Sequence, residues 1–193
     1  MKRLSLAAVA AALMLVLAGC TAEPLAEQYG PGGGQGYISG DGAYTELPPD
    51  ARGESIGFAG PDERGDTISS EDFAGQVVVV NFWYAGCPPC RVEAPDLASL
   101  DAEYEDVPFL GVNIFDGAEV SLAFAENFGI EYPSILDAGT AAVQLAFAGQ
   151  VSPNAVPTTL VLDREGRVAG RISGLIRDRA ILAAMIDTVL EEG

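Results

Sequence analysis

The sequence predicts an α/β domain in which helices cover both faces of a mixed central sheet. Two patterns predict this class: β-branched and aromatic runs alternate with segments of helical apolar spacing, and a strand pair followed by a helix ends the chain. With 193 residues, 49% of them hydrophobic, one domain with a sizeable core and tails is expected. The excess of 28 Asp and Glu over 10 Lys and Arg argues against nucleic acid as a partner.

The chain begins with the pattern of a bacterial export signal. Lys2 and Arg3 precede a largely apolar run over residues 4–18, which is too short to span a bilayer comfortably. The run ends in Leu17-Ala18-Gly19-Cys20, which resembles the lipobox of bacterial lipoproteins, where the cysteine is diacylated and becomes the mature N-terminus. Residues 1–19 are therefore expected to be a lipoprotein signal peptide, and Cys20 the lipid anchor that holds the chain outside the cytoplasm on the bacterial cell membrane. An uncleaved anchor with an incidental Cys20 is the alternative, and it leads to the same side of the membrane.

Residues 20–53 are expected to form a flexible tether. They are rich in Gly, Pro, Ser and acidic residues, with Gly30-Pro31-Gly32-Gly33-Gly34 near the middle, and they show no apolar periodicity. A weak strand over residues 44–47 is left open. The folded domain is expected over residues 54–193, where short apolar segments alternate with Gly and Asp.

The central element of the domain is a strand expected over residues 77–83. Its uninterrupted β-branched and aromatic run is typical of a strand that is buried on both faces. A helix should follow from Pro88 and Pro89, because proline is tolerated in the first turn. The next strand is expected at residues 109–114. The buried side of the helix is expected to carry Leu97, Leu100 and Tyr104.

The second half of the domain continues the alternation. Asp116 and Glu119 resemble a capping box that opens a helix ending at Gly129. The buried face of this helix is expected to carry Val120, Phe124 and Phe128. The remaining expected elements are an extended segment at 132–136, a short helix at 140–147, a strand at 158–162, its hairpin partner at 167–172, and a last helix with Ile181, Met185 and Val189 on one side.

Two cysteines three positions apart stand where the central strand meets its helix. A Cys-x-x-Cys pair at such a junction is the signature of a redox site of the thioredoxin type. A thiol in the first turn of a helix faces unpaired N–H groups and the positive end of the helix dipole, so Cys87 is expected to have a lowered pKa and to be the accessible nucleophile. Cys90 lies one turn further on, where it can close the disulfide.

Other uses of this pair are less favoured. The chain has no histidine, which removes Ser-His and Cys-His nucleophile pairs and the commonest metal ligand. A zinc site needs four ligands, and a structural bridge across so short a loop restricts the unfolded chain little. We therefore expect a redox-active Cys87–Cys90 disulfide with no metal and no cofactor. Pro88 and Pro89 lack N–H groups, so fewer donors reach Cys87, which favours a reducing pair, although prolines suited only to the helix start are the alternative.

Four motifs in order resemble the TlpA/ResA-type membrane-anchored thioredoxin-like proteins of the redoxin/AhpC-TSA superfamily. They are Asn81-Phe82-Trp83 before Cys87-Pro88-Pro89-Cys90, then Arg91-Val92-Glu93-Ala94-Pro95, Val156-Pro157-Thr158-Thr159 and Asp163-Arg164-Glu165-Gly166. The resemblance runs from about Gly53 to the C-terminus and implies a thioredoxin-like fold with an N-terminal extension and a central insertion at about residues 119–150. It also implies thiol-disulfide oxidoreductase activity, since relatives reduce protein disulfides outside the cytoplasm, often in cytochrome c maturation. The partners it implies are protein thiols and disulfides and a membrane electron donor, and we expect a monomer.

The resemblance also assigns roles to single residues. Catalytic roles fall to Cys87, Cys90, Glu93 and Pro157, and substrate binding to Trp83, Pro88, Pro89 and Val156. Glu93 would exchange the proton of Cys90, which needs a raised carboxyl pKa, and an ordinary surface carboxylate is the alternative. Pro157 would follow a cis peptide bond, with the backbone of Val156 holding an extended substrate. Trp83 is expected in the core and also as a wall of the substrate groove.

Two residues depart from the family pattern. Gly86 stands where these proteins usually carry a bulky residue before the first cysteine, so the substrate-facing surface should differ. Asn81 stands where cytoplasmic thioredoxins have a buried Asp, and Glu93 is the family's analogue of that proton acceptor.

Two other functions fit a similar fold. A thiol peroxidase would need one low-pKa cysteine with a nearby Thr and Arg on a different spacing, and no such group precedes Cys87. A non-enzymatic copper-binding assembly factor would need a longer cysteine spacing and a distal histidine, and the chain has none.

Overall fold

The computed structural model describes residues 43–151 and 155–192. The expected signal peptide, Cys20 and residues 20–42 of the expected tether lie outside these ranges. Within them, no helix is both long and apolar enough to cross a membrane.

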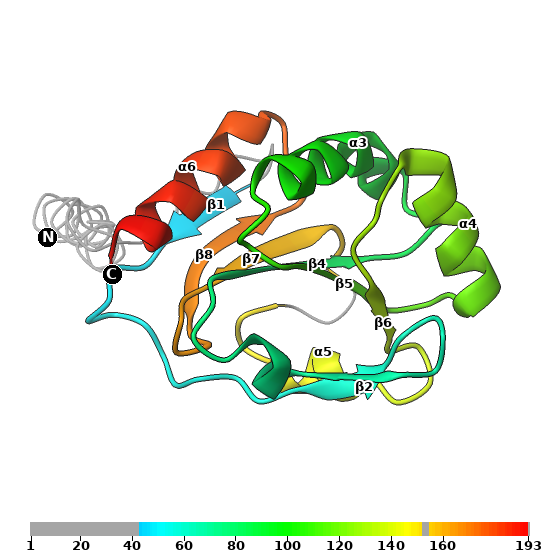
Figure 1. Ribbon diagram of the computed structural model, residues 1–193, viewed down its shortest axis with the longest axis horizontal. Helices are drawn as coiled ribbons and strands as arrows, with labels where there is room; N and C mark the ends of the chain where they lie inside the picture. The colour runs from blue at the N-terminus through cyan, green and yellow to red at the C-terminus, as the bar shows by residue number, and fades with distance from the viewer. Residues whose placement is uncertain (1–42, 152–154, 193) are drawn as a thin grey trace, which may run out of the picture. The chain divides into compact units, whose positions relative to one another are not determined.

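A six-stranded mixed sheet forms the centre of the domain (Figure 1). Its strand order is β1-β8-β7-β4-β5-β6, with β4 parallel to β5 and antiparallel to β7. This sheet confirms the predicted mixed α/β class. The strands are β1 (Ala43–Glu46), β4 (Val78–Trp83), β5 (Phe109–Asn113), β6 (Ser134–Leu136), β7 (Thr158–Leu162) and β8 (Val168–Ser173).

The central strand β4 is buried on both faces, as its continuous apolar run predicted. All six of its residues are buried. Successive side chains of a strand point to opposite faces. Val79 accordingly packs in one apolar cluster with Leu97 and Leu100, while Val80 packs in the other with Phe147.

Helices cover one side of the sheet, and a helix with a small hairpin covers the other (Figure 1). The first group is α3 (Pro88–Glu103), α4 (Ala118–Phe128) and α6 (Arg179–Glu191). The second is α5 (Ala142–Ala146), the antiparallel hairpin of β2 (Ala59–Pro61) and β3 (Thr67–Ser69), and the 3-10 helix η2 (Ser70–Phe73). The elements α4, β6 and α5 lie between β5 and β7 in the chain, where the central insertion was expected.

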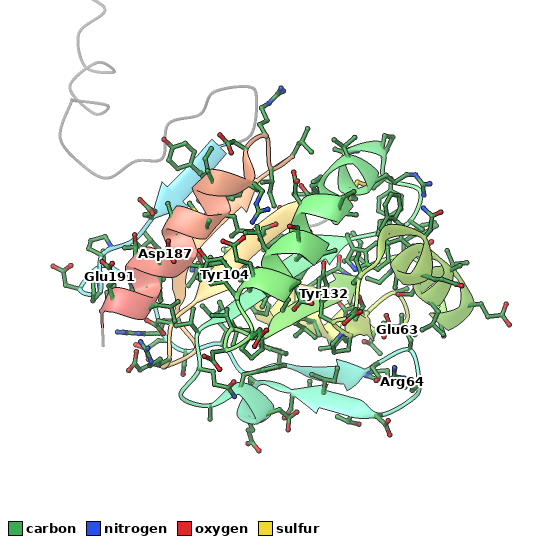
Figure 2. All side chains as sticks on the ribbon, turned by 45° about the horizontal axis from the view of Figure 1, so that its top comes forward. Glu63, Arg64, Tyr104, Tyr132, Asp187 and Glu191 are labelled. Atoms are coloured by element: carbon green, nitrogen blue, oxygen red, sulfur yellow. A yellow bond between two sulfur atoms is a disulfide. The ribbon has the colours of Figure 1, made fainter. Side chains whose placement is uncertain are left out.

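The two long helices are joined at the C-terminal end of α3. The Tyr104 hydroxyl donates a hydrogen bond of 2.9 Å to the Asp187 carboxylate of α6, and the two residues lie together in Figure 2. Burial and this bond raise the pKa of Tyr104 to about 12. The opposite end of α3, which carries the cysteines, directly follows the carboxyl end of β4.

The domain starts earlier than the expected boundary at residue 54. β1 pairs antiparallel with β8, with Tyr44 opposite Ile172, so the strand left open over residues 44–47 is part of the main sheet. Arg52 then places its guanidinium against Asp163 and Glu192. Residues 43–53 therefore belong to the domain and not to a tether. The sequence signal was weak because an edge strand leaves side chains exposed, as Tyr44 is at 51%.

The capping box expected at Asp116 and Glu119 is wrong. Gly117 is the N-cap of α4, and no side chain caps it. Asp116 instead accepts a hydrogen bond of 2.6 Å from the N–H of Ala85, which lies before the cysteines. Gly129 ends the helix at a φ of 69°, as predicted.

The buried face of α4 also differs from the expected one. Phe124 is buried as predicted, whereas Val120 is 47% exposed. Ser121 takes the buried position because its hydroxyl donates a hydrogen bond of 2.8 Å to Glu63. The spacing of apolar residues could not predict the buried face of α4, because the buried hydroxyl of Ser121 has its hydrogen-bond partner 58 positions away in the sequence.

Candidate active site

The two predicted cysteines are joined in a disulfide at the start of α3. The bond length between Cys87 Sγ and Cys90 Sγ is 2.06 Å. Cys87 is the N-cap of the helix, and Pro88 and Pro89 occupy its first two positions. Proline suits these positions because its fixed φ matches the helix and its missing N–H would have no partner there. The local sequence therefore places a sulfur at the N-terminus of a helix that begins directly after the central strand.

The same prolines limit how the helix can stabilise a thiolate. The N–H of Cys90 lies 3.2 Å from Cys87 Sγ and points to it as a donor. Pro88 and Pro89 have no N–H, so Cys90 supplies the only backbone donor among the first three helical positions. A thiolate on Cys87 would thus receive fewer hydrogen bonds than in a helix that starts with other residues.

The disulfide lies just beneath the surface. Cys87 and Cys90 are each 2% exposed, so the expectation of an accessible Cys87 sulfur is wrong for the oxidised form. Both sulfurs pack in an apolar cluster with Trp83 and Phe124. The residues on either side of Cys87, Gly86 and Pro88, are exposed. The chain on either side of Cys87 is therefore at the surface, while the sulfur itself is covered.

Trp83 supports the disulfide from the core. It is 4% exposed, and its ring lies 4.2 Å from that of Phe124, measured between centroids. Its indole N–H donates a hydrogen bond of 3.2 Å to the Ser134 hydroxyl. The core position is confirmed, and so buried a ring offers little surface to a substrate.

Glu93 is a buried carboxyl held between two other elements beneath α3. It is 1% exposed, which rules out the surface alternative. Its Oε1 accepts a hydrogen bond of 3.0 Å from the side-chain amide of Asn81 on β4, and its Oε2 accepts one of 3.0 Å from the N–H of Ile176. The Asn81 amide also donates to the Thr159 hydroxyl at 3.0 Å. Asn81, which stands where cytoplasmic thioredoxins have a buried Asp, is thus in direct contact with Glu93.

Burial dominates the ionisation of this carboxyl. Desolvation raises the pKa of Glu93 to about 7, although the hydrogen bonds from Ile176 and Asn81 act in the opposite direction. A carboxyl with this pKa can take up and release a proton near neutral pH.

The peptide bond between Val156 and Pro157 is cis, as predicted. Val156 is half-buried and packs against the cluster that contains the disulfide. The carbonyl of Pro157 accepts a hydrogen bond of 2.8 Å from Gly174. The structure thus brings Val156, Pro157 and the cysteine pair to one end of the sheet.

Two charged residues that we did not predict hold the loop before Cys87. The N–H of Ala85 donates to the Asp116 carboxylate at 2.6 Å, and the C=O of Ala85 accepts from the Arg91 guanidinium at 3.2 Å. Arg91 also lies over the Phe128 ring, 5.1 Å from its centroid. Sequence could not reveal this arrangement, because Asp116 and Ala85 are 31 positions apart and the bond is made by a backbone group.

Replacing Asp116 with alanine is expected to lower the free energy of unfolding by about 1.5–3 kcal/mol, the usual effect of losing a hydrogen bond to a charged group. Asp116→Asn keeps an acceptor oxygen for the Ala85 N–H, so it should lose clearly less. Urea denaturation of the two variants measures this difference. Equal losses in the two variants would mean that the negative charge matters and the bond to Ala85 does not.

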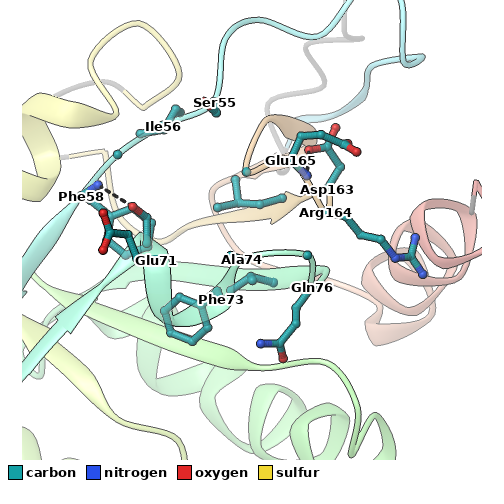
Figure 3. Close-up of a pocket in the computed structure, with 16 residues that line it drawn as sticks. Ser55, Ile56, Phe58, Glu71, Phe73, Ala74, Gln76, Asp163, Arg164 and Glu165 are labelled. Carbon is teal, nitrogen blue, oxygen red and sulfur yellow. Dashed lines mark hydrogen bonds between the residues drawn. The ribbon is translucent and has the colours of Figure 1, made fainter.

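A cavity of about 260 Å³, shown in Figure 3, has neither cysteine in its lining. It is lined by the segment around Phe58, by Phe73 and by the turn between β7 and β8, which includes Arg164 and Glu165. Its lining includes none of the predicted site residues, so we assign the chemistry to the cysteine pair and not to this cavity.

Comparison with known proteins supports this assignment. The model of the AhpC/TSA family matches residues 53–171. The thiol-disulfide oxidoreductase ResA of Geobacillus kaustophilus is 32% identical over 138 residues, which cover 68% of this chain and 76% of that protein. The ResA of Halalkalibacterium halodurans is 27% identical over 117 residues, which cover 60% of this chain and 64% of that protein, slightly less than two thirds of its length.

Solved structures show the same architecture. A secreted thiol-disulfide isomerase from Corynebacterium glutamicum is 28% identical, with a TM-score of 0.66 over 81% of this chain and 99% of that chain. Together with the strand order, this similarity confirms the predicted thioredoxin-like fold, with additional strands at the N-terminus.

Proposed function

The chain belongs to the AhpC/TSA family as a thioredoxin-like thiol-disulfide oxidoreductase of the ResA type, and we propose that it reduces protein disulfides outside the cytoplasm while anchored to the membrane. The observation that carries the proposal is the Cys87–Cys90 disulfide at the N-terminus of α3, packed beside Val156. Such a pair exchanges electrons with other disulfides through a covalent intermediate.

The proposed reaction begins with the reduced protein. The Cys87 thiolate attacks one sulfur of a substrate disulfide, which forms a mixed disulfide and releases the other substrate sulfur as a thiolate. The Cys90 thiolate then attacks Cys87 Sγ, which releases the substrate as a dithiol and leaves the disulfide that the structure contains. Two electrons pass from the protein to the substrate, and a membrane electron donor would restore the dithiol.

We propose that Glu93 accepts the proton of the Cys90 thiol and later returns it. Cys90 has to lose its proton before it attacks, and Glu93 follows it on the same helix by one turn. Its pKa of about 7 allows it to accept this proton near neutral pH. Val156 and Pro157 are proposed to hold the substrate backbone beside Cys87, with Pro88 and Pro89 on the outer surface.

The direction of electron flow is proposed from the prolines. A disulfide oxidises others strongly when its leaving thiolate is well stabilised. Pro88 and Pro89 withhold two backbone donors from Cys87, so a strong oxidant is not favoured. We therefore propose a reductase, with cytochrome c maturation as one setting in which protein disulfides need reduction.

The proposed location rests on the N-terminal sequence. Residues 1–19 have the pattern of a lipoprotein signal peptide, and Cys20 is the proposed lipid anchor. Residues 20–42 would then link the membrane to the domain. The related protein from Corynebacterium glutamicum is described as secreted, which supports an extracytoplasmic site of action.

Trapping the covalent intermediate tests the proposed reaction. Reduced Cys90→Ala protein is mixed with insulin whose disulfides are intact. A mixed disulfide that dithiothreitol cleaves is expected to accumulate, because Cys87 can attack the substrate but Cys90 is no longer present to release it. Cys87→Ala is the matched control and should give no adduct. An adduct that forms with Cys87→Ala and not with Cys90→Ala would reverse the two roles.

A further inference from the structure

An exposed aromatic side chain lies in the loop that contacts the active-site loop. Phe115 is 74% exposed, on the turn between β5 and α4. Its ring centroid lies 5.7 Å from that of Tyr84, which is half-buried against the disulfide cluster. Single exposed apolar residues are common on protein surfaces, but this one extends an apolar cluster that contains the reacting sulfurs.

Tyr84 lies next to Gly86, the residue immediately before Cys87. A Cβ atom added to Gly86 would come within 3.2 Å of Tyr84 Cε2, which is tighter than ordinary packing. A side chain at position 86 would therefore lie directly against the Tyr84 ring, which would have to shift slightly. Because position 86 carries no side chain, the aromatic rings nearest this part of the loop are those of Tyr84 and, through its contact with Tyr84, Phe115.

The loop that carries Phe115 is held in place by hydrogen bonds. Asn113 is fully buried, and its Oδ1 accepts from the N–H groups of Phe115 at 3.0 Å and Asp116 at 2.7 Å. Asp116 in turn accepts from the Ala85 N–H at 2.6 Å. The backbone that carries Phe115 is therefore held against the loop that carries Tyr84, so a ligand that contacts both rings would not have to order this loop.

We propose that Tyr84 and Phe115 form a docking surface for an apolar side chain next to the reacting cysteine of the substrate. This inference rests on the proposed function, because the substrate is a polypeptide whose cysteine bonds to Cys87. The Cys87 N–H donates a hydrogen bond of 3.1 Å to the carbonyl of Tyr84, so substrate residues that neighbour the bonded cysteine are placed close to Tyr84 and to the Phe115 ring beside it. Preferred substrates would carry an aromatic or large aliphatic residue there.

The preference can be measured with two short peptides that each contain a disulfide and differ only beside the cysteine, where one has Phe and the other Ser. In a single turnover, the reduced full-length protein is expected to reduce the Phe peptide with a second-order rate constant about tenfold higher than that for the Ser peptide, as one partly buried apolar side chain allows. Phe115→Ser should bring this ratio close to one, and Phe115→Leu should retain most of it.

Leu145→Ser is the matched control. Leu145 is 76% exposed, as Phe115 is, but it lies on α5 at the other face of the sheet (Figure 1). The control should keep the ratio of the unchanged protein. Equal ratios in the unchanged protein and Phe115→Ser, or an equal loss in Leu145→Ser, would overturn the docking surface. Failure of the unchanged protein to reduce either peptide would overturn the proposed function itself.

Discussion

Replacing Glu93 with glutamine is expected to remove a pH-dependent loss of stability of about 3 kcal/mol. The pKa of Glu93 is about 7 in the folded protein against 4.5 in the unfolded chain. Between these values the folded protein binds more protons, so its stability falls as pH rises through this window and stays low above it. Each pKa unit corresponds to ~1.36 kcal/mol, so the difference between the folded and unfolded pKa values gives a change in stability of about 3 kcal/mol. Denaturation of both proteins at pH 4.5 and pH 8 measures it.

The comparison between the two proteins isolates this one group. Glutamine presents an amide N–H₂ to either Asn81 or Ile176, both of which donate to the carboxylate, so the variant carries a cost of its own. That cost does not change with pH, so it cancels when the stability of the variant at pH 4.5 is compared with its stability at pH 8. All other carboxylates titrate alike in the two proteins. A difference that stays constant from pH 4.5 to pH 8 would show that Glu93 does not titrate in this range.

The same substitution tests the proposed proton transfer. The rate of disulfide exchange in the unchanged protein is expected to show an inflection near pH 7 that Glu93→Gln lacks. Stability and rate are independent readouts. A pH-dependent stability with an unchanged rate profile would leave Glu93 as a buried titrating group with no role in exchange.

Replacing Arg52 with methionine is expected to lower the free energy of unfolding by about 3 kcal/mol, the lower end for breaking a buried ion pair. The Arg52 side chain is 3% exposed and lies 3.1 Å from the Asp163 carboxylate, which is 4% exposed. It also bonds to Glu192 at 2.7 Å and to the carbonyl of Leu47 at 2.9 Å. The loss is at the lower end because Asp163 keeps its bond to Arg167. Urea denaturation measures the change.

Arg64→Met is the matched control for Arg52→Met. Arg64 is exposed in the hairpin of β2 and β3 (Figure 2), and its loss is expected to change stability by less than about 0.5 kcal/mol. A loss below about 1 kcal/mol for Arg52→Met would place its ion pairs among ordinary surface pairs. Residues 43–53 would then contribute to the domain mainly through β1.

The parts of the fold that the sequence predicted well are those whose burial is encoded locally. β4 and β7 are short runs dominated by β-branched and other apolar residues because both faces of a central strand are covered, and α3 begins at two prolines. The cysteine spacing predicted the disulfide at the start of α3, and the motif at Pro157 predicted the cis peptide bond.

The parts that the sequence did not predict depend on contacts between distant residues. β1 is recognisable only through its pairing with β8, which lies far along the chain. Asp116 has the sequence context of a helix cap, but its carboxylate bonds to a backbone group of another loop. The depth of Cys87 depends on how Trp83 and Phe124 pack around it, which spacing does not specify.

The most direct measurement is a redox titration of Cys87 and Cys90 in dithiothreitol buffers and in glutathione buffers at pH 7, followed by alkylation of free thiols. The missing donors at Pro88 and Pro89 and the burial of the pair predict a reducing potential, close to the value of about −270 mV for thioredoxin. A potential near the value of about −120 mV for DsbA would contradict this, because it would require a strongly stabilised Cys87 thiolate and a protein that oxidises its substrates.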